Sequence, residues 1–258
     1  MNNHRITLRV WGDFACFTRP EMKVERVSYP VMTPSAARGI LEAVFWEPQM
    51  YYLIDAIRVV KRGRWVSFRR NEVTKIVSLD SAKTWMRDPD KTVPIHAGGG
   101  ATDGTQRNML ALQDVEYLIT AEVRTTPLAD RPEDKAEKYL DEIERRVRQG
   151  KCFHRPGLGM REFAADFDWF EGDPDATIRQ QPEPYSEDLG LMLYDVFDHR
   201  DRSQGFRWLR SDEPPGEQRW TGKLIKPQAA FFRAKLERSI MDCHPDRIKI
   251  LTPATGAN

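Results

Sequence analysis

Apolar and polar positions alternate near the start of the chain and then change to a helical spacing. The alternation over residues 5–11 is the pattern of a strand with one buried face. Thr33 has the character of an N-cap, and Pro34 would occupy the first helical position. Apolar residues then recur at helical spacing, and we expect Pro48 to end this helix. The first part of the chain therefore predicts a strand followed by a helix.

The following segments continue the alternation of strands and helices. Residues 52–60 are rich in β-forming side chains, and a hairpin partner is expected around residues 65–70. Residues 115–123 alternate again and predict a long strand. Residues 133–149 form the clearest amphipathic helix, with Gly150 where a C-terminal cap belongs. The order strand, helix, strand, strand, strand, helix predicts an α+β fold with a ferredoxin-like core.

The remaining segments divide the chain into a core and an extension. Residues 80–107 are polar and Gly-rich at their end, so we expect an excursion or flexible hairpin tip. Acidic and proline-rich connections follow, and they separate strand-like pieces at residues 163–170, 189–196 and 206–209. Residues 228–243 show a helical pattern. We therefore predict a core over residues 1–159, and a smaller β region with a C-terminal helix over residues 160–258.

The net charge and its distribution leave a nucleic-acid partner open. The 258 residues include 40 Lys and Arg against 39 Asp and Glu, so the formal net charge is only +1. That sum argues against a polyanion partner until its distribution is considered. Basic residues concentrate in segments 58–70 and 145–161, whereas acidic residues concentrate in 130–144 and 166–188. The distribution predicts binding through one face of the molecule.

Cysteine usage and hydropathy point to a reducing compartment. Cys16, Cys152 and Cys243 are far apart and lack metal-ligand spacing, so neither a disulfide framework nor a zinc site is expected. No window reaches the roughly 18 apolar residues of a membrane span, and no signal peptide is evident. We expect a cytoplasmic protein that needs no cofactor or metal and contacts no membrane.

Basic and aromatic residues lie together in two parts of the chain. Trp65 and Phe68 lie among basic residues of one cluster and Phe153 lies in the other, an arrangement that suits phosphates and unstacked RNA bases. The alternative is that these residues form a solvated face, in which Arg145 to Arg148 stabilise the C-terminal end of their helix through its dipole. Lys138 and Tyr139 in the helix over 133–149 are of the types that metal-free RNA cleavage uses, although such a pair is usually ordinary helix surface.

The histidines do not form a second candidate site in the sequence. They lie in loops or near the termini without the spacing of metal ligands, at His4, His96, His199 and His244. We expect each of them to be a surface residue. The chain also lacks the motifs of P-loop hydrolases, zinc proteases and serine hydrolases.

Several blocks of sequence resemble one known family. They are WGDFACFTRP at 11–20, RVSY at 26–29, TPSAARGILEA at 33–43, FWEP at 45–48, RRNE at 69–72, GKCFHRP at 150–156 and LGMREF at 158–163. Together they resemble the type I-C CRISPR-associated proteins that process precursor crRNA. The resemblance covers roughly residues 5–170 and implies an RNA-recognition-motif-like core of the repeat-associated (RAMP) superfamily, with a C-terminal β-sheet extension.

The resemblance also implies a function and partners. Such proteins cleave the CRISPR repeat without metal, leaving a cyclic phosphate and a 5′-hydroxyl. They then stay on the 5′ handle of the mature crRNA as a Cascade subunit, beside the backbone and large subunits, and meet target DNA only through that complex. The Gly-rich excursion resembles their thumb-like hairpin.

The family's catalytic positions are only partly kept. A Tyr or His that precedes the Trp after the first helix is Phe45 here, and a Lys-His pair in the second helix is Lys138-Tyr139. Candidate RNA contacts implied by the resemblance are Lys23, Arg26, Arg38, Arg69, Arg70, Asn71, Arg107, His154 and Arg161. The sequence therefore leaves three hypotheses: a metal-independent endoribonuclease, a non-catalytic subunit that binds the handle, or an RNA-binding protein outside CRISPR.

Overall fold

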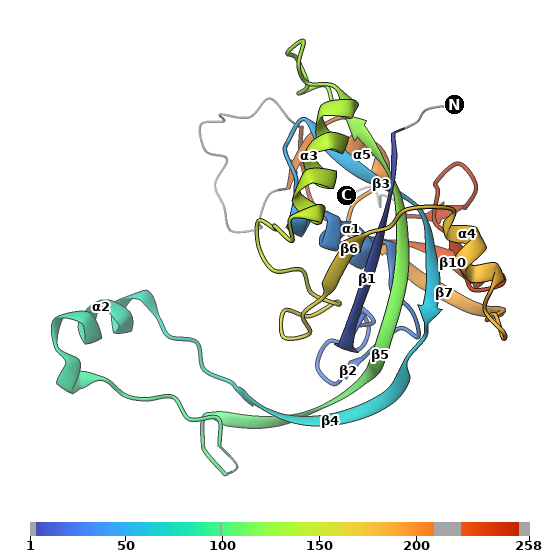
Figure 1. Cartoon of the computed structure of the whole chain (residues 1–258). Coiled ribbons are helices and arrows are strands. Elements are labelled where there is room, and N and C mark those ends of the chain that lie inside the picture. Colours follow the sequence, from blue (N-terminus) through green and yellow to red (C-terminus); the bar gives the residue numbers. More distant parts are fainter. Residues whose placement is uncertain (1–3, 99, 209–222, 253–258) are drawn as a thin grey trace.

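The chain is a mixed α/β protein built on antiparallel sheets (Figure 1). The computed structural model describes residues 4–98, 100–208 and 223–252. The strands of the main sheet are β1 (Arg5–Ala15), β2 (Arg26–Val27), β3 (Met50–Lys61), β4 (Arg64–Val73), β5 (Gly104–Thr125), β6 (Asp166–Trp169) and β11 (Ile240–Asp242). The order is β11-β3-β5-β1-β6, and β2 and β4 also pair with β5. The predicted strands over residues 5–11, 52–60, 65–70 and 115–123 are confirmed. The predicted hairpin between residues 52–60 and 65–70 is wrong, because β4 pairs with β5 and β3 lies between β5 and β11.

Helices and two smaller sheets complete the described residues. The helices are α1 (Pro34–Val44), α2 (Leu79–Arg87), α3 (Ala136–Arg148), α4 (Pro174–Arg179) and α5 (His199–Ser203), with a 3-10 turn η1 (Pro89–Lys91). The smaller sheets contain β7 (Glu187–Asp195), β10 (Ala230–Leu236) and β12 (Ile250–Leu251), and the pair β8 (Phe206–Trp208) with β9 (Lys223–Ile225). Among these helices, none is long and apolar enough to cross a membrane.

Helix α1 begins where its sequence predicts and ends earlier. The Thr33 hydroxyl accepts a hydrogen bond from the Ala36 N–H at 3.2 Å, which satisfies a free donor of the first turn. The helix ends at Val44, because Phe45 already has an extended backbone with φ −158°. The expected end at Pro48 was therefore too late, and Phe45 projects from the turn after the helix.

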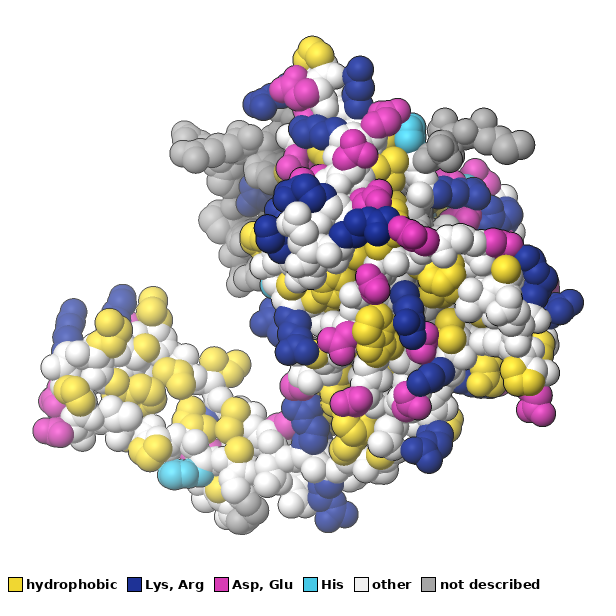
Figure 2. Space-filling view, viewed as in Figure 1, with side chains coloured by type: hydrophobic (Ala, Val, Ile, Leu, Met, Phe, Trp, Pro, Cys, Tyr) yellow, Lys and Arg dark blue, Asp and Glu magenta, His cyan; other side chains and the backbone are white. Residues whose placement is uncertain are grey.

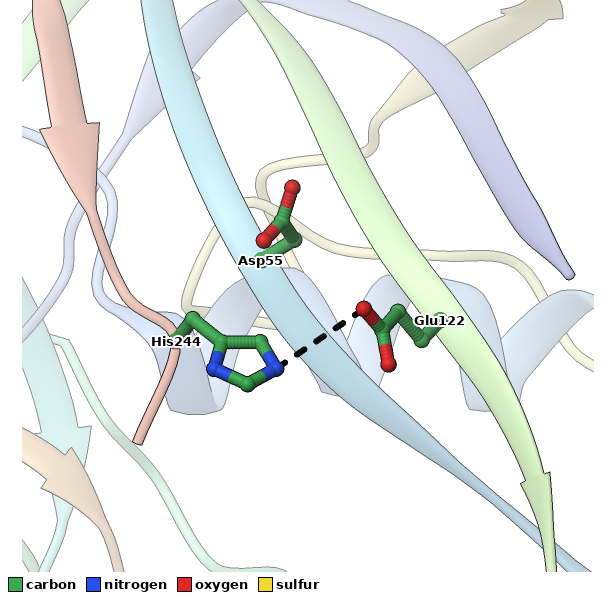
Figure 3. A group of neighbouring side chains, drawn as sticks. All are labelled: Asp55, Glu122 and His244. Carbon is green, nitrogen blue, oxygen red and sulfur yellow. Dashed lines mark ion pairs between the residues drawn. The ribbon is translucent and has the colours of Figure 1, made fainter. Parts of the chain in front are cut away.

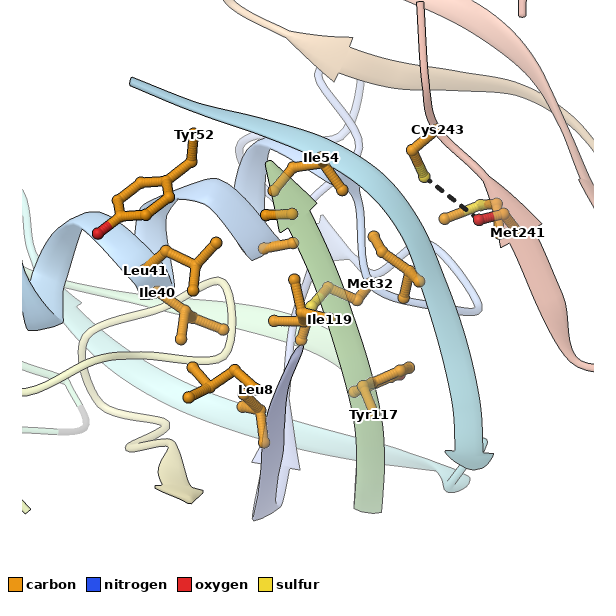
Figure 4. Packing of buried hydrophobic residues seen from close by; sticks show 14 of the residues in the cluster. Leu8, Met32, Ile40, Leu41, Tyr52, Ile54, Tyr117, Ile119, Met241 and Cys243 are labelled. Atoms are coloured by element: carbon orange, nitrogen blue, oxygen red, sulfur yellow. Dashed lines mark hydrogen bonds between the residues drawn. The ribbon is translucent and has the colours of Figure 1, made fainter. Parts of the chain in front are cut away.

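Helices α1 and α3 pack beside each other on the main sheet. α1 contacts β3, α3 contacts β5 and β6, and the two helices also touch. Figure 4 shows Ile40 and Leu41 of α1 directed toward Leu8 and Ile119 of the strands, and all four are at most 1% exposed. Burying each such side chain contributes about 1.5 to 3 kcal/mol to folding. This core fixes the ends of both helices, where the candidate site lies.

A long two-stranded arm projects from the body (Figure 1). β4 and the first half of β5 pair from Arg64 opposite Gln113 to Val73 opposite Gly104. Beyond this ladder the arm continues through residues 74–98 and 100–103 and contains α2, none of whose residues is buried. Residues 80–107, where the sequence predicts an excursion or flexible hairpin tip, contain α2 and η1, and the last of them belong to β5. Gly99 of the Gly-rich stretch lies outside the described residues.

The predicted helix over residues 228–243 is wrong. The segment forms β10 and β11, joined by a turn in which Arg238 and Ser239 have positive φ angles of 50° and 64°. In β10 every second residue is buried, from Ala230 to Leu236. That alternation is present in the sequence, but the adjacent Phe231 and Phe232 gave an apparent helical spacing.

Strands from the second half of the chain join the main sheet. β6 pairs with β1, and β11 pairs with β3, so both edges of that sheet come from residues after 160. The predicted strands near 163–170, 189–196 and 206–209 correspond to β6, β7 and β8, although residue 209 lies outside the described part. The division of the chain at residue 160 stays a prediction.

Candidate nucleic-acid interface

A loop after α3 forms one wall of a groove beside α1. The loop spans residues 153–162, and its first two N–H groups, those of Phe153 and His154, donate to the Ala43 carbonyl at 2.9 and 3.2 Å. Further along, the Leu158 carbonyl accepts from the Cys16 N–H at 3.0 Å. The loop is therefore held both to the end of α1 and to the chain that follows β1.

Gly159 allows the loop to approach this closely. Its φ is +83°, a conformation that favours glycine, and a Cβ atom there would lie 2.2 Å from the Cys16 carbonyl oxygen. Any other side chain would push the loop away from the body. Steric crowding therefore explains why this position of the LGMREF block is a glycine. The loop that it holds in place carries Arg161 at the groove.

Basic side chains line this groove and its continuation. The groove encloses about 790 Å³ between α1 and the loop, and His154, Arg155 and Arg161 lie in its wall. A second hollow of about 490 Å³ shares Arg161 and adds Lys23, Arg26 and Glu162. We call the two together the basic groove. Figure 2 shows Lys and Arg side chains along the edge of the body that faces the arm.

Several of these charges are available for a ligand. Within the part of the chain that the structure describes, Lys23 and Arg161 make no ion pair. Arg155 has only a 4.0 Å contact with Asp166. Cationic side chains without a local counterion suit phosphate groups, because binding releases the ions condensed on the polyanion.

The β4–β5 ladder brings a second group of candidates close to this groove. Arg70 lies opposite Arg107 in the ladder and donates to Glu162 of the loop at 2.6 Å. Arg69 and Asn71 are exposed positions on either side of Arg70. The structure thus brings together Lys23, Arg26, His154 and Arg161 in the groove and connects them to the ladder through Arg70.

Arg38 has a structural role instead. Its guanidinium donates to both carboxylate oxygens of Asp195 at 2.7 and 3.0 Å and also to Glu42, while Arg202 donates to Glu42 at 2.9 Å. Its side chain is only 11% exposed and that of Asp195 only 8%. Burial alone would raise the pKa of Asp195, but Arg38 and Arg202 lower it below its usual value. The contacts of Arg38 therefore do not support an RNA-binding role.

The candidate catalytic residues meet between the ends of α1 and α3. The rings of Phe45 and Tyr139 lie 6.4 Å apart, and the Tyr139 hydroxyl donates to Asp134 Oδ1 at 2.9 Å. The Lys138 ammonium donates to the same oxygen at 3.1 Å. As expected for adjacent helical positions, Lys138 is 46% exposed whereas Tyr139 is buried.

The surroundings of Tyr139 disfavour it as a proton acceptor. Burial and the hydrogen bond to the Asp134 carboxylate raise the pKa of Tyr139 well above its ordinary value near 10. A phenol in that state stays protonated at neutral pH, and its proton already points at Asp134. Tyr139 therefore does not fit the role of a catalytic base, and Lys138 remains the exposed member of the pair.

Asp134 is a residue that sequence analysis missed. The hydrogen bonds from Lys138 and Tyr139 lower its pKa, so it stays ionised. Its second oxygen, Oδ2, is buried and has no hydrogen-bond partner among the described residues. Its spacing four residues before Lys138 was the available signal, since such pairs face each other on a helix. Arg155 lies in the basic segment 145–161, but the sequence did not place it among the predicted RNA contacts.

Asp55, Glu122 and His244 form a compact cluster on β3, β5 and the segment after β11 (Figure 3). His244 is 5% exposed, so the expectation of a surface residue was wrong. Its Nε2 lies 3.7 Å from Glu122. Arg247 bonds Asp55 at 2.7 Å and Arg124 bonds Glu122 at 2.6 Å. Because arginines already neutralise both carboxylates, the cluster serves to hold the C-terminal segment on the sheet.

Comparison with known proteins identifies relatives over most of the length. The model of the family described as CRISPR-associated protein (Cas_Cas5) matches residues 5–244. The CRISPR pre-crRNA endoribonuclease Cas5d of Mannheimia succiniciproducens is 42% identical over 206 residues, which cover 79% of this chain and 90% of that protein. The protein of the same name from Thermus thermophilus is 41% identical over 193 residues, covering 74% and 73%.

A solved structure shares the architecture. A protein described as a CRISPR-associated protein superposes with a TM-score of 0.58 and 18% sequence identity, covering 92% of this chain and 90% of the other. At this level of identity the likeness concerns the fold alone. It agrees with the mixed α/β arrangement around the main sheet.

Proposed function

The chain belongs to the CRISPR-associated protein (Cas_Cas5) family, and from this premise we propose that it is a type I-C endoribonuclease that cuts precursor crRNA. The observation that carries the proposal is the 42% identity with a pre-crRNA endoribonuclease over 90% of that relative's length. After cutting the repeat, the protein stays on the 5′ handle as a subunit of Cascade. This activity belongs in the cytoplasm.

The topology supports a ferredoxin-like core of the repeat-associated superfamily. The four strands β3, β5, β1 and β6 are neighbours in this order, and α1 and α3 are the two crossovers of a split β-α-β unit. In this proposal residues 1–159 supply this core except for its fourth strand, and residues 160–258 form an extension that supplies this strand, β6, and the opposite edge strand, β11.

The basic groove and the ladder are the proposed RNA path. Its contacts are the candidates that the sequence suggested, apart from Arg38: Lys23, Arg26, Arg69, Arg70, Asn71, Arg107, His154 and Arg161. Phe153 is 82% exposed, and its ring lies 5.7 Å from that of His154 in the groove wall, so it offers an aromatic face on which an RNA base can stack. The arrangement suits a single strand whose phosphates follow the basic side chains.

The arm is the proposed contact with neighbouring subunits, and Figure 2 shows how much of it is hydrophobic. Ile76, Leu79, Met86 and Val93 are 95, 70, 84 and 67% exposed. Exposed apolar side chains in such density are typical of surfaces that a partner covers. We assign them to the backbone and large subunits of Cascade and to the crRNA between them, so that target DNA is met only through the complex.

The proposed chemistry needs no metal. The ribose 2′-oxygen attacks the adjacent phosphorus, the bond to the 5′-oxygen breaks, and a cyclic phosphate and a 5′-hydroxyl result. Lys138, half exposed beside the Phe45 and Tyr139 pair, stabilises the charge that develops on the phosphate. No step of this reaction depends on the Tyr139 hydroxyl.

A cleavage assay tests the proposal. The protein is incubated with its cognate repeat RNA in EDTA, and one cut beside the hairpin is expected. Lys138→Ala should abolish the cut while the RNA remains bound, whereas Lys235→Ala, an exposed lysine on β10, should leave it unchanged. An uncut repeat that stays bound to the unmodified protein would exclude the enzymatic activity.

One observation favours a second candidate, a non-catalytic subunit that binds the handle. Phe45 has no proton to transfer, and Tyr139 is buried and protonated. In this case Phe45→Tyr combined with Tyr139→His should produce or sharply raise cleavage. If the unmodified protein already cuts and the double variant gains nothing, the second candidate is excluded.

A further inference from the structure

A separate hollow lies at the N-terminal end of α3, next to Lys138. It encloses about 640 Å³ and is lined by His4, Arg124, Asp134, Lys135 and Glu137, among others. Asp134 belongs to both this hollow and the Lys138 and Tyr139 contact. The hollow therefore adjoins the candidate catalytic region, and it contains a histidine that the proposed reaction has not used.

His4 is held in one orientation by Glu137 of α3. Its Nε2 lies 2.8 Å from the Glu137 carboxylate, and its backbone carbonyl accepts from the Val123 N–H at 2.9 Å. Hydrogen bonds from its own backbone N–H and from His4 lower the pKa of Glu137, so this carboxylate is ionised and only accepts. In neutral His4 the proton must then lie on Nε2, and the lone pair of Nδ1 is available.

The hollow also contains two cations beside a carboxylate. Asp134 is only 4% exposed, and its Oδ2 is buried and has no partner among the residues described. Arg124 and Lys135 add positive charge at the wall. The phosphate of an RNA strand brings negative charge that matches these cations, and its ribose brings a hydroxyl, the group that a general base deprotonates.

We propose that His4, oriented by Glu137, is the general base of the RNA cleavage. The proposal rests on the endoribonuclease function above and supplies the proton acceptor that Phe45 and Tyr139 do not. His4 Nδ1 takes the proton of the 2′-hydroxyl as the oxygen bonds to phosphorus. The bond from phosphorus to the 5′-oxygen breaks, and that oxygen takes a proton from water. A carboxylate behind a histidine stabilises the imidazolium that forms.

Charged and titratable groups around His4 come from three elements. They are Tyr51 on β3, Glu122 and Arg124 on β5, and Asp134, Lys135 and Glu137 at the start of α3. A general base acts only while it is unprotonated, so the cleavage rate should rise with pH and then level off.

Single-turnover cleavage in EDTA, with protein in excess over repeat RNA, tests the proposal between about pH 5 and 8.5. His4→Gln should lower the rate about 100-fold or more, because a general base contributes at least that factor. It should also remove the rise with pH, while RNA affinity stays the same. Glu137→Gln should lower the rate less, about tenfold, since it acts through His4.

A matched histidine and a chemical rescue separate catalysis from structure. His199, on α5, also lies beside a carboxylate, 3.2 Å from Asp198, and His199→Gln should change neither rate nor pH profile. Free imidazole should restore part of the rate of His4→Ala, as it replaces the missing base. A merely structural loss would not respond to imidazole.

The outcomes distinguish a failure of the His4 assignment from a failure of the endoribonuclease proposal. If the unmodified protein cuts and His4→Gln cuts at the same rate with the same pH profile, the assignment of His4 is overturned and the endoribonuclease remains. A loss of rate without imidazole rescue and with lost RNA binding also overturns it. If the unmodified protein does not cut its repeat at all, the endoribonuclease proposal fails, and the assignment of His4 fails with it.

Discussion

Two groups of charged side chains flank helix α1, and they have opposite characters. On one side, Arg38 and Glu42 of α1 meet Asp195 and Arg202 in a buried network. On the other side, the basic groove exposes Arg161 and its neighbours beside the same helix. The first group is internally neutral and closed, whereas the second has an excess of positive charge and is open to a ligand.

The difference shows that the charge of an arginine does not reveal whether it binds RNA or stabilises the fold until its counterions are known. Arg38 and Arg161 both lie in sequence blocks that resemble the family. Arg38 reaches Asp195, which is 157 positions away in the sequence, and this pairing consumes its donors. Arg161 has no such partner among the residues described and keeps its donors for a ligand. Stability and RNA binding should therefore respond to different arginines.

Arg38→Ala should have the largest effect on stability. It leaves Asp195 buried beside only one guanidinium, and removing one member of a buried ion pair costs about 3 to 5 kcal/mol. Urea unfolding followed by circular dichroism measures the loss. Arg155→Ala, an exposed arginine of the groove, should stay within about 0.5 kcal/mol of the unmodified protein. Equal stabilities for the two variants would remove the distinction between the groups.

Acid should have the second-largest effect, because it weakens the buried network around Asp195. The pKa of Asp195 is lower in the folded protein than in the unfolded chain, so its contribution is complete above the unfolded value of about 3.9. The contribution is lost as the pH falls through the lower, folded value. We expect thermal stability to drop below about pH 4, and Asp195→Asn to reduce that drop. A variant with the same acid dependence as the parent would contradict this role for Asp195.

Local patterns predicted most elements because their causes are local. The alternation in β1 and the N-cap of Thr33 depend only on neighbours in the sequence, and both were predicted. The tail was misassigned because Phe231 and Phe232 are adjacent, and only the sheet decides which of them faces the core. The helix α2 within the arm was missed because it buries no residue against the body and so leaves no long apolar stripe.

The candidate site was harder to predict because its parts meet only in three dimensions. The groove unites Lys23 with Arg161 through the loop that Gly159 holds against the chain that follows β1. The sequence contains these residues as separate blocks, and only the family resemblance suggested that they act together. The pairings of Arg38 and of His4 involve partners more than 100 positions away. No spacing rule could have found them.

Arg161→Ala should reduce RNA affinity with no loss of stability. Removing one phosphate contact should weaken binding about three- to tenfold at moderate salt, and should make the slope of log affinity against log salt shallower by about 0.7 to 0.9. Fluorescence anisotropy with labelled repeat RNA over a salt series measures both. Lys235→Ala, exposed on β10 away from the groove, should change neither quantity. An unchanged slope for Arg161→Ala would remove this residue from the RNA path.

Tyr139→Phe should have the smallest effect. It tests whether a buried side chain outside both groups contributes to the chemistry. Tyr139 is buried like Arg38, yet its hydroxyl bonds Asp134, which also binds the half-exposed Lys138. Losing one hydrogen bond while the ring stays in place should cost at most about 1 kcal/mol, measured by urea unfolding. Single-turnover cleavage should keep its rate, because the protonated hydroxyl transfers no proton. A fall in rate of 100-fold with unchanged stability would instead place the Tyr139 hydroxyl in the chemistry.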